Sequence, residues 1–176
     1  MKIFRKLVLL IPVLLSVVSS CKDQGGDVMP LSPDEELFRF VTQVDPFTSY
    51  TLFPSVDSVT RGTLNGSTAH QPLVRVSMNA TAYSVLNHDT LPAGSQFPDS
   101  SVIFKQIMMN GQTTLYAVIF KDSGHELSGN GWLWTEFSPD GTPFISLTRR
   151  GVNCVGCHSL EQGPRHDYVR TFERQH

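Results

Sequence analysis

Residues 101–120, SVIFKQIMMNGQTTLYAVIF, decide the fold expected for this 176-residue chain. Two apolar runs rich in β-branched residues stand on either side of Asn110-Gly111, and this dipeptide is the strongest short signal for a two-residue hairpin turn. A regular turn of this kind places Lys105 opposite Tyr116. The stretch therefore predicts two antiparallel strands joined by a tight turn.

The segments around this hairpin add strands and helices to the expected fold. Residues 72–79, PLVRVSMN, alternate as a strand does, and residues 131–137, GWLWTEF, are predicted to form a further strand. Residues 32–35, SPDE, carry a capping residue, a first-turn proline and a capping box, which together predict a helix start. A short helix is expected at 80–86. These patterns predict an α+β fold, an antiparallel β-sheet with flanking helices, and argue against a four-helix bundle.

Near the end of the chain, the segment CVGCH has the spacing that attaches haem covalently in c-type cytochromes. Cys154 and Cys157 can each form a thioether to a haem vinyl group, and His158 can reach the iron from the same turn. The alternative is a zinc site, to which His166 would supply a fourth ligand. No methionine follows the motif, so the iron is expected to keep one side open for a small molecule, and an electron carrier with a methionine ligand is disfavoured.

The first residues have the features of an export signal. Basic residues and a short apolar run in residues 1–20 end at Cys21, and the small residues before it resemble the cleavage site of a bacterial lipoprotein. We expect Cys21 to carry a lipid, residues 21–31 to form a flexible tether, and residues 32–176 to form the haem domain. Ordinary cleavage that leaves Cys21 as a thiol is the alternative. The predicted protein is exported, anchored to a bacterial membrane, and faces the periplasm or the cell surface.

Charge and cysteine usage agree with this compartment. Removal of residues 1–20 takes away three of the 14 lysines and arginines and none of the 16 acidic residues, which leaves a net charge of −5. No basic run remains to bind nucleic acid or an acidic membrane surface. One lipid and one haem account for all 3 cysteines, so no disulfide is expected.

Several short segments, in this order and at this spacing, resemble the cytochrome P-460 family and its relatives, the beta-type cytochromes c′. The resemblance covers residues 68–172 and departs from the family at Ser100, a common glycine, and at Gln106, a common acid. Its segments are HQPLVRVSMNATAY (70–83), FPDSSVIFKQ (97–106), VIFKDSG (118–124), GNGWLWTEF (129–137), NCVGCH (153–158) and DYVRTF (167–172).

The resemblance implies one haem c attached to Cys154 and Cys157, with His158 as the axial iron ligand. It also implies a lysine cross-linked to the haem at Lys105 and a distal-pocket arginine at Arg75. The implied activity is redox chemistry on a small nitrogen compound, hydroxylamine or nitric oxide, with a redox partner protein that the sequence does not identify. A homodimer is the assembly that the resemblance suggests. The rival function is non-enzymatic binding or sensing of nitric oxide, as in the beta-type cytochromes c′.

The residues themselves also bear on Lys105. It shares a strand face with Ile103 and Ile107, and burial among apolar neighbours favours the neutral, nucleophilic form of a lysine amine. For both Lys105 and Arg75, the alternative is a solvated charge on the surface of the sheet. Hydroxylamine oxidation also needs a proton acceptor near the iron, and the sequence singles out none.

Overall fold

The structure is a computed structural model that describes residues 31–53, 60–61, 69–160 and 163–174. The strands of this part of the chain are β1 (Thr51–Phe53), β2 (Thr60–Arg61), β3 (Leu73–Met78), β4 (Val102–Met109), β5 (Gln112–Lys121), β6 (Trp132–Phe137) and β7 (Pro143–Ile145). The helices are α1 (Pro33–Arg39), the π-helical η1 (Phe40–Val44), α2 (Ala80–Tyr83) and α3 (Val152–His158). Short 3-10 turns complete the described elements: η2 (Phe47–Ser49), η3 (Leu147–Arg149), η4 (Gly163–His166) and η5 (Arg170–Arg174).

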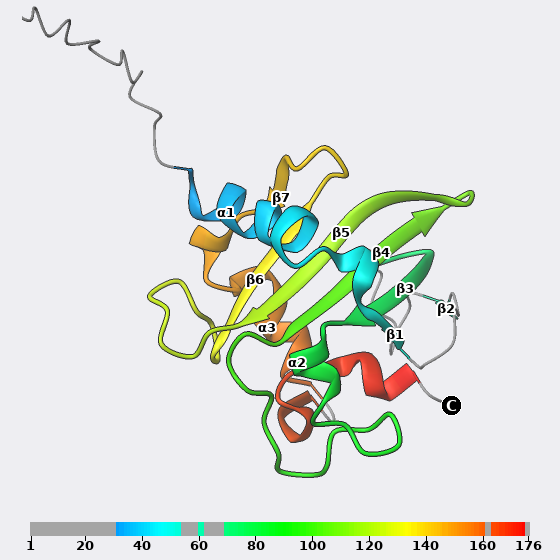
Figure 1. Ribbon diagram of the computed structural model, residues 1–176, viewed down its shortest axis with the longest axis vertical. Coiled ribbons are helices and arrows are strands. Elements are labelled where there is room, and N and C mark those ends of the chain that lie inside the picture. Colours follow the sequence, from blue (N-terminus) through cyan, green and yellow to red (C-terminus); the bar gives the residue numbers. More distant parts are fainter. Residues whose placement is uncertain (1–30, 54–59, 62–68, 161–162, 175–176) are drawn as a thin grey trace, which may run out of the picture. The chain divides into compact units, whose positions relative to one another are not determined.

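The strands pair antiparallel in the order β1-β3-β4-β5-β6-β7, with β2 also paired to β3 (Figure 1). This is the predicted α+β fold, an antiparallel sheet with flanking helices. The predicted strands at 72–79 and 131–137 are present as β3 and β6. The predicted helix at 80–86 is shorter, because α2 ends at Tyr83 and the chain then turns into an isolated bridge between Asn87 and Thr90.

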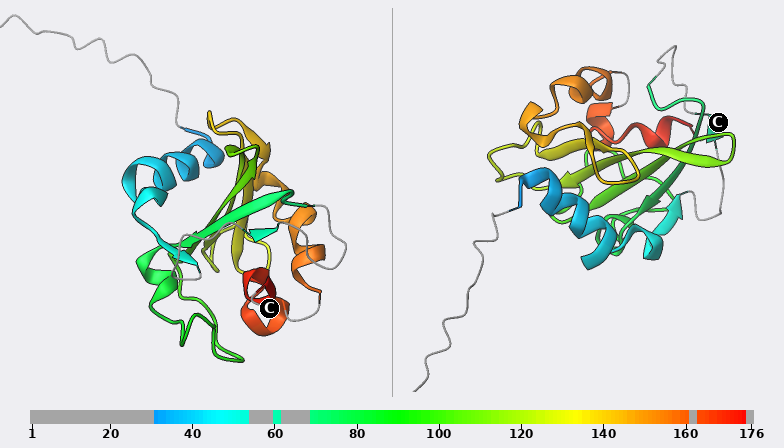
Figure 2. Two further views of the ribbon diagram at one scale, coloured as in Figure 1. Left: turned by 90° about the vertical axis from the view of Figure 1, so that its right-hand side faces the viewer. Right: turned by 90° about the horizontal axis from the view of Figure 1, so that it is seen from above.

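Different parts of the chain cover the two faces of the sheet. In the left view of Figure 2, α1 and η1 lie on one side of the strands, whereas α3, η4 and η5 lie on the other. On the first side, Val41 belongs to a buried cluster with Phe104 of β4. On the second side, Ile103 and Trp134 belong to a cluster with Val169. The two faces of β4 therefore serve two separate cores, because successive side chains of a strand point to opposite sides.

The first turn of α1 has the predicted capping box. The Ser32 hydroxyl accepts a hydrogen bond from the Glu35 N–H at 3.3 Å, and the Glu35 carboxylate accepts one from the Ser32 N–H at 2.7 Å. The buried Asp34 side chain accepts from the Leu147 N–H at 2.8 Å and from the Ser146 hydroxyl at 2.6 Å. These bonds tie α1 to η3, the turn that leads into α3.

The β4–β5 hairpin forms at Asn110-Gly111 as predicted, but the predicted pairing of Lys105 with Tyr116 is wrong. A β-bulge between Ile107 and Met108 shifts the register by one residue. Lys105 is paired with Ala117, and Tyr116 is paired with Gln106. The extra residue lies on β5. Beyond the bulge, each β5 side chain therefore points to the face of the sheet opposite to the one predicted from a regular hairpin.

The predicted export signal (1–20), lipidated Cys21 and most of the tether (21–31) lie outside the described residues. Among the residues that the structure describes, no helix has both the length and the apolar character needed to cross a bilayer.

Candidate haem-binding site

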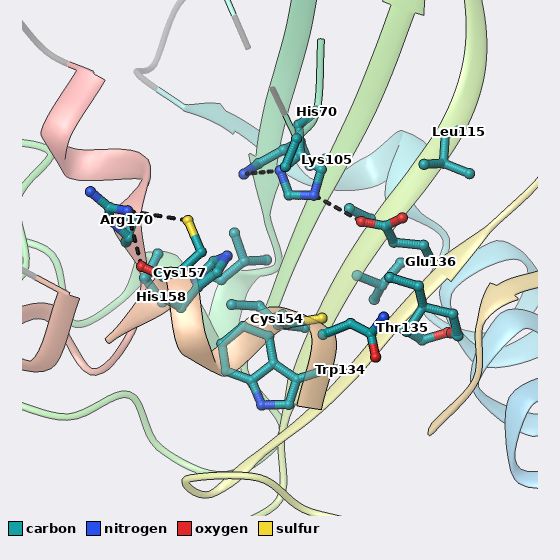
Figure 3. A pocket seen from close by; sticks show the side chains of 18 of the residues that line it. His70, Lys105, Leu115, Trp134, Thr135, Glu136, Cys154, Cys157, His158 and Arg170 are labelled. Carbon is teal, nitrogen blue, oxygen red and sulfur yellow. Dashed lines mark hydrogen bonds and ion pairs between the residues drawn. The ribbon is translucent and has the colours of Figure 1, made fainter. Parts of the chain in front are cut away.

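A cavity of about 370 Å³ lies on the side of the sheet that α3 covers. Residues of β4, β5, β6 and β7 line it, together with α3 and residues 169–171. Most of the lining is apolar, including Ile103, Leu115 and Ile119, and a few polar side chains project into it (Figure 3). Small-molecule and cofactor sites have this size and this mixture of a large apolar lining with few polar groups.

Helix α3 presents the CVGCH motif to this cavity. Cys154 and Cys157 are three residues apart, so one face of the helix carries both thiols, and both line the cavity. Gly151 precedes the helix with a φ of +73°, and a Cβ at this position would lie 2.5 Å from the Trp134 ring. A glycine is therefore needed where the start of α3 approaches β6.

The imidazole of His158 is oriented for metal binding. Its Nδ1 lies 2.6 Å from the carbonyl oxygen of Tyr168 and must donate to it, so Nε2 is the nitrogen whose lone pair can bind iron. The ring also packs edge-on against Trp134, with centroids 4.8 Å apart. Burial, and then the charge of Lys105, lowers the pKa of His158 to about 3. The ring is therefore neutral at neutral pH, which is the form that binds a metal.

The two thiols have different surroundings. Burial, followed by the charge of Glu136, raises the pKa of Cys154 to about 12. At Cys157, the buried Arg170 side chain donates from Nη1 to the carbonyl oxygen at 3.0 Å and to Sγ at 3.3 Å. Both cysteines are free of disulfides. Two available sulfurs on one helical turn and a free imidazole nitrogen beside an apolar cavity fit a haem c group.

The strand side of the cavity carries three hydrogen-bonded polar side chains (Figure 3). The Nζ of Lys105 lies 3.5 Å from Nδ1 of His70, and Nε2 of His70 lies 2.9 Å from Oε1 of Glu136. All three residues line the cavity, and Lys105 and Glu136 are each only 8% exposed. The structure therefore brings Lys105 into the same cavity as Cys154, Cys157 and His158, whose attachment chemistry the sequence predicted.

The structure does not bring Arg75 to this cavity. In β3 the residue paired with Lys105 is Val76, and Arg75 is paired with Gln106, so Arg75 lies on the opposite face of the sheet. The zinc alternative also lacks its ligand set. Within the described ranges, no group of three or more His, Cys, Asp or Glu side chains could hold a metal ion, and the His166 ring packs on Phe172 at 5.1 Å between centroids.

Among the side chains on the strand side of the cavity, sequence reasoning missed His70 and Glu136. His70 belongs to a segment that resembles the family, yet nothing in the sequence assigns it a contact. Glu136 is an acid in the apolar strand β6. It lies two residues after Trp134, whose ring contacts His158, so both side chains point to the same face of the strand. An acid at a cavity-facing position of an apolar strand is a signal that could have pointed to it.

A CxxCH helix that faces a largely apolar cavity, with a neutral histidine at the end of the motif, is the arrangement expected of a haem c protein. The family model described as cytochrome P460 matches residues 57–171, so the chain belongs to the cytochrome P460 family. Haem c is the cofactor that this family implies, and members act on nitrogen compounds such as hydroxylamine. A comparison with curated proteins found no match.

Proposed function

We propose that this protein is a mono-haem c-type oxidoreductase that oxidises a small nitrogen compound, hydroxylamine or nitric oxide. The observation that carries the proposal is the carboxylate of Glu136. It lies in the wall of the cavity that also holds His158, and it is buried and hydrogen-bonded to His70. Glu136 is thus the proton acceptor that the sequence did not reveal.

Different residues of the chain hold the iron and accept protons in this reaction. The haem, when bound, supplies an iron that binds the nitrogen compound and accepts its electrons. His158 would hold the iron through Nε2, while the carbonyl oxygen of Tyr168 fixes the ring through Nδ1. Oxidation of hydroxylamine breaks N–H and O–H bonds and releases protons as well as electrons, and Glu136 takes up a proton at Oε2 or Oε1 while His70 holds the carboxylate in place. The apolar lining, which includes Leu115 and Ile119, limits the access of water.

The test is Glu136→Gln in the haem-loaded protein. We expect hydroxylamine oxidation to fall by about 10²- to 10⁴-fold, the usual loss when a general base is removed. Binding of nitric oxide should persist, because it depends on the iron and on His158. Glu126→Gln is the matched control, since Glu126 is an exposed acid on a loop. Wild-type turnover in Glu136→Gln would contradict the assignment of this carboxylate.

The apolar character of the lining favours a second function, the non-enzymatic binding of nitric oxide or another gas. A site with one strong protein ligand to iron and mostly aliphatic walls binds small uncharged molecules well. The two functions give different results with the unmodified protein. Tight nitric oxide binding without any oxidation of hydroxylamine would establish the gas-binding function.

Two further parts of the proposal rest on the sequence and the family resemblance. We propose a cross-link between Lys105 and the haem, which intact mass and the absorption spectrum of Lys105→Ala would test. We also propose that the protein is exported and held on a membrane by a lipid on Cys21. Cys21→Ser should then move the protein from the membrane fraction to the soluble fraction without loss of haem. Unchanged fractionation would show that something else anchors it.

A further inference from the structure

Lys105, His70 and Glu136 form a continuous chain of hydrogen-bonding groups in the cavity wall. The two contacts join Nζ of Lys105 to Nδ1 of His70 at 3.5 Å and Nε2 of His70 to Oε1 of Glu136 at 2.9 Å. The imidazole therefore uses both of its nitrogens, one toward an amine and one toward a carboxylate. This is the arrangement of a nucleophile, a base and a group that orients the base.

The chemistry of the three groups fixes how protons are shared. A carboxylate can only accept, so Nε2 of His70 carries a hydrogen and donates it to Glu136. In the neutral ring, Nδ1 then has a lone pair that points toward Nζ of Lys105. The contact of 3.5 Å is long, as catalytic contacts often are before the site is filled.

The position of Glu136 favours movement of a proton from Lys105 to His70. A proton on the imidazole is directly hydrogen-bonded to the carboxylate, whereas a proton on Nζ is separated from it by the width of the ring. Attraction between opposite charges grows as their distance falls, and it is strong in a buried site. Glu136 therefore stabilises the imidazolium of His70 more than the ammonium of Lys105.

Four other titratable groups among the described residues line the cavity. They are Cys154, Cys157, His158 and Arg170. Burial disfavours the charged form of both His158 and Cys154, because it lowers the pKa of the first and raises the pKa of the second. Arg170 is a permanent cation that donates to the carbonyl oxygen and the Sγ of Cys157.

We propose that Glu136, His70 and Lys105 form a proton relay that converts Lys105 into a neutral, nucleophilic amine facing the cavity. In the relay an Nζ–H bond breaks and an Nδ1–H bond forms on His70, with no gain or loss of electrons. Within this relay His70 and Glu136 act through Lys105, in addition to the role of Glu136 as proton acceptor for the substrate. The proposal rests on the function proposed above and deepens it, since it explains how an amine in this cavity loses its proton at neutral pH.

The experiment treats the full haem-loaded chain with trace acetic anhydride from pH 6 to pH 11 and maps Lys105 by peptide mass. Acetylated and cross-linked Lys105 are counted together, because both products require the free amine. At pH 7, His70→Gln and Glu136→Gln should each lower this conversion at least about tenfold, the effect of one pKa unit on a neutral amine. The conversion should return to the wild-type level near pH 11, where solvent removes the proton without the relay.

Two controls separate the relay from a loss of structure. Lys121 is a buried lysine paired with Asp167 and should be acetylated at the same rate in every variant. Glu126→Gln should leave Lys105 unchanged. If His70→Gln also changes the labelling of Lys121, the isosteric Glu136→Gln decides the question. Conversion within twofold of the wild type at pH 7 in Glu136→Gln would overturn the relay. If the wild type does not oxidise hydroxylamine, but the two variants show this pH dependence relative to it, the proposed function is overturned and the relay stands.

Discussion

Replacement of Asp167 by asparagine should strongly destabilise the protein, because Asp167 pairs with a buried lysine. The carboxylate accepts two hydrogen bonds from Nζ of Lys121, at 2.9 and 2.8 Å, and one from the Phe97 N–H at 2.9 Å. Its side chain is 2% exposed and that of Lys121 is 6% exposed. The next residue, Tyr168, supplies the carbonyl that orients His158. The pair therefore anchors the segment on which the predicted iron ligand depends.

The size of the effect follows from what asparagine keeps and what it removes. Asp167 has a φ of +51°, a left-handed conformation that asparagine tolerates well, and the amide oxygen can still accept from Phe97. The change removes the negative charge, puts an amide NH2 donor in place of one of the two oxygens that accept from Lys121, and leaves the Lys121 ammonium without its anion. Breaking a buried ion pair in this way costs about 3–5 kcal/mol.

Urea unfolding of the haem-loaded protein, followed by far-ultraviolet circular dichroism, measures this loss. The control is a double variant, Lys121→Met with Asp167→Asn, which removes both charges and keeps the acceptor for Phe97. It should recover most of the lost free energy of unfolding, because a buried ion pair can be replaced by apolar groups at little cost. A loss below about 1 kcal/mol in Asp167→Asn, or a double variant no more stable than the single one, would refute the reasoning.

Two further predictions concern the segment that carries the haem motif. In the haem-free chain at pH 8, iodoacetamide should alkylate Cys157 well before Cys154, because burial holds the pKa of Cys154 at about 12 and leaves little thiolate. Labelling of Cys154 should rise about tenfold per pH unit up to pH 11, and equal labelling of both thiols in peptide maps would contradict the prediction. Gly163→Ala should destabilise the protein by about 1–3 kcal/mol, because a Cβ there would overlap the carbonyl oxygen of His158. Gly156→Ala, where nothing lies within 4 Å, is the control, and equal melting temperatures of the two variants would disprove the steric argument.

The chemistry of the covalent site could be predicted because its parts are local in the sequence. Cys154, Cys157 and His158 occupy little more than one turn of α3, so their spacing alone brings them to one face. The β4–β5 hairpin was predictable for the same reason, since Asn110-Gly111 specifies a tight turn wherever it joins two strands. In both cases the interactions that form the structure lie within a few residues.

The polar chain on the strand side of the cavity could not be predicted in this way. His70 and Glu136 are 66 residues apart, and they meet only because the sheet places β3, β4, β5 and β6 side by side. No local pattern fixes the order of strands in a sheet. Arg75 is the opposite case, a residue that was predicted to lie in the cavity and does not. Its neighbour Val76 is the residue paired with Lys105, so Arg75 faces away from the cavity.

The sequence by itself determined the haem motif, the hairpin and the alternation of β4 that gives Lys105 its apolar neighbours. The tertiary structure alone decided which face of β5 meets Lys105. The bulge between Ile107 and Met108 puts Ala117, and not Tyr116, opposite the lysine. Side chains alternate with a period of two, so one extra residue moves every later side chain of a strand to the other face. Whether β5 contains a bulge residue depends on how both faces of the sheet pack against the rest of the protein, and residues far apart in the sequence make those contacts.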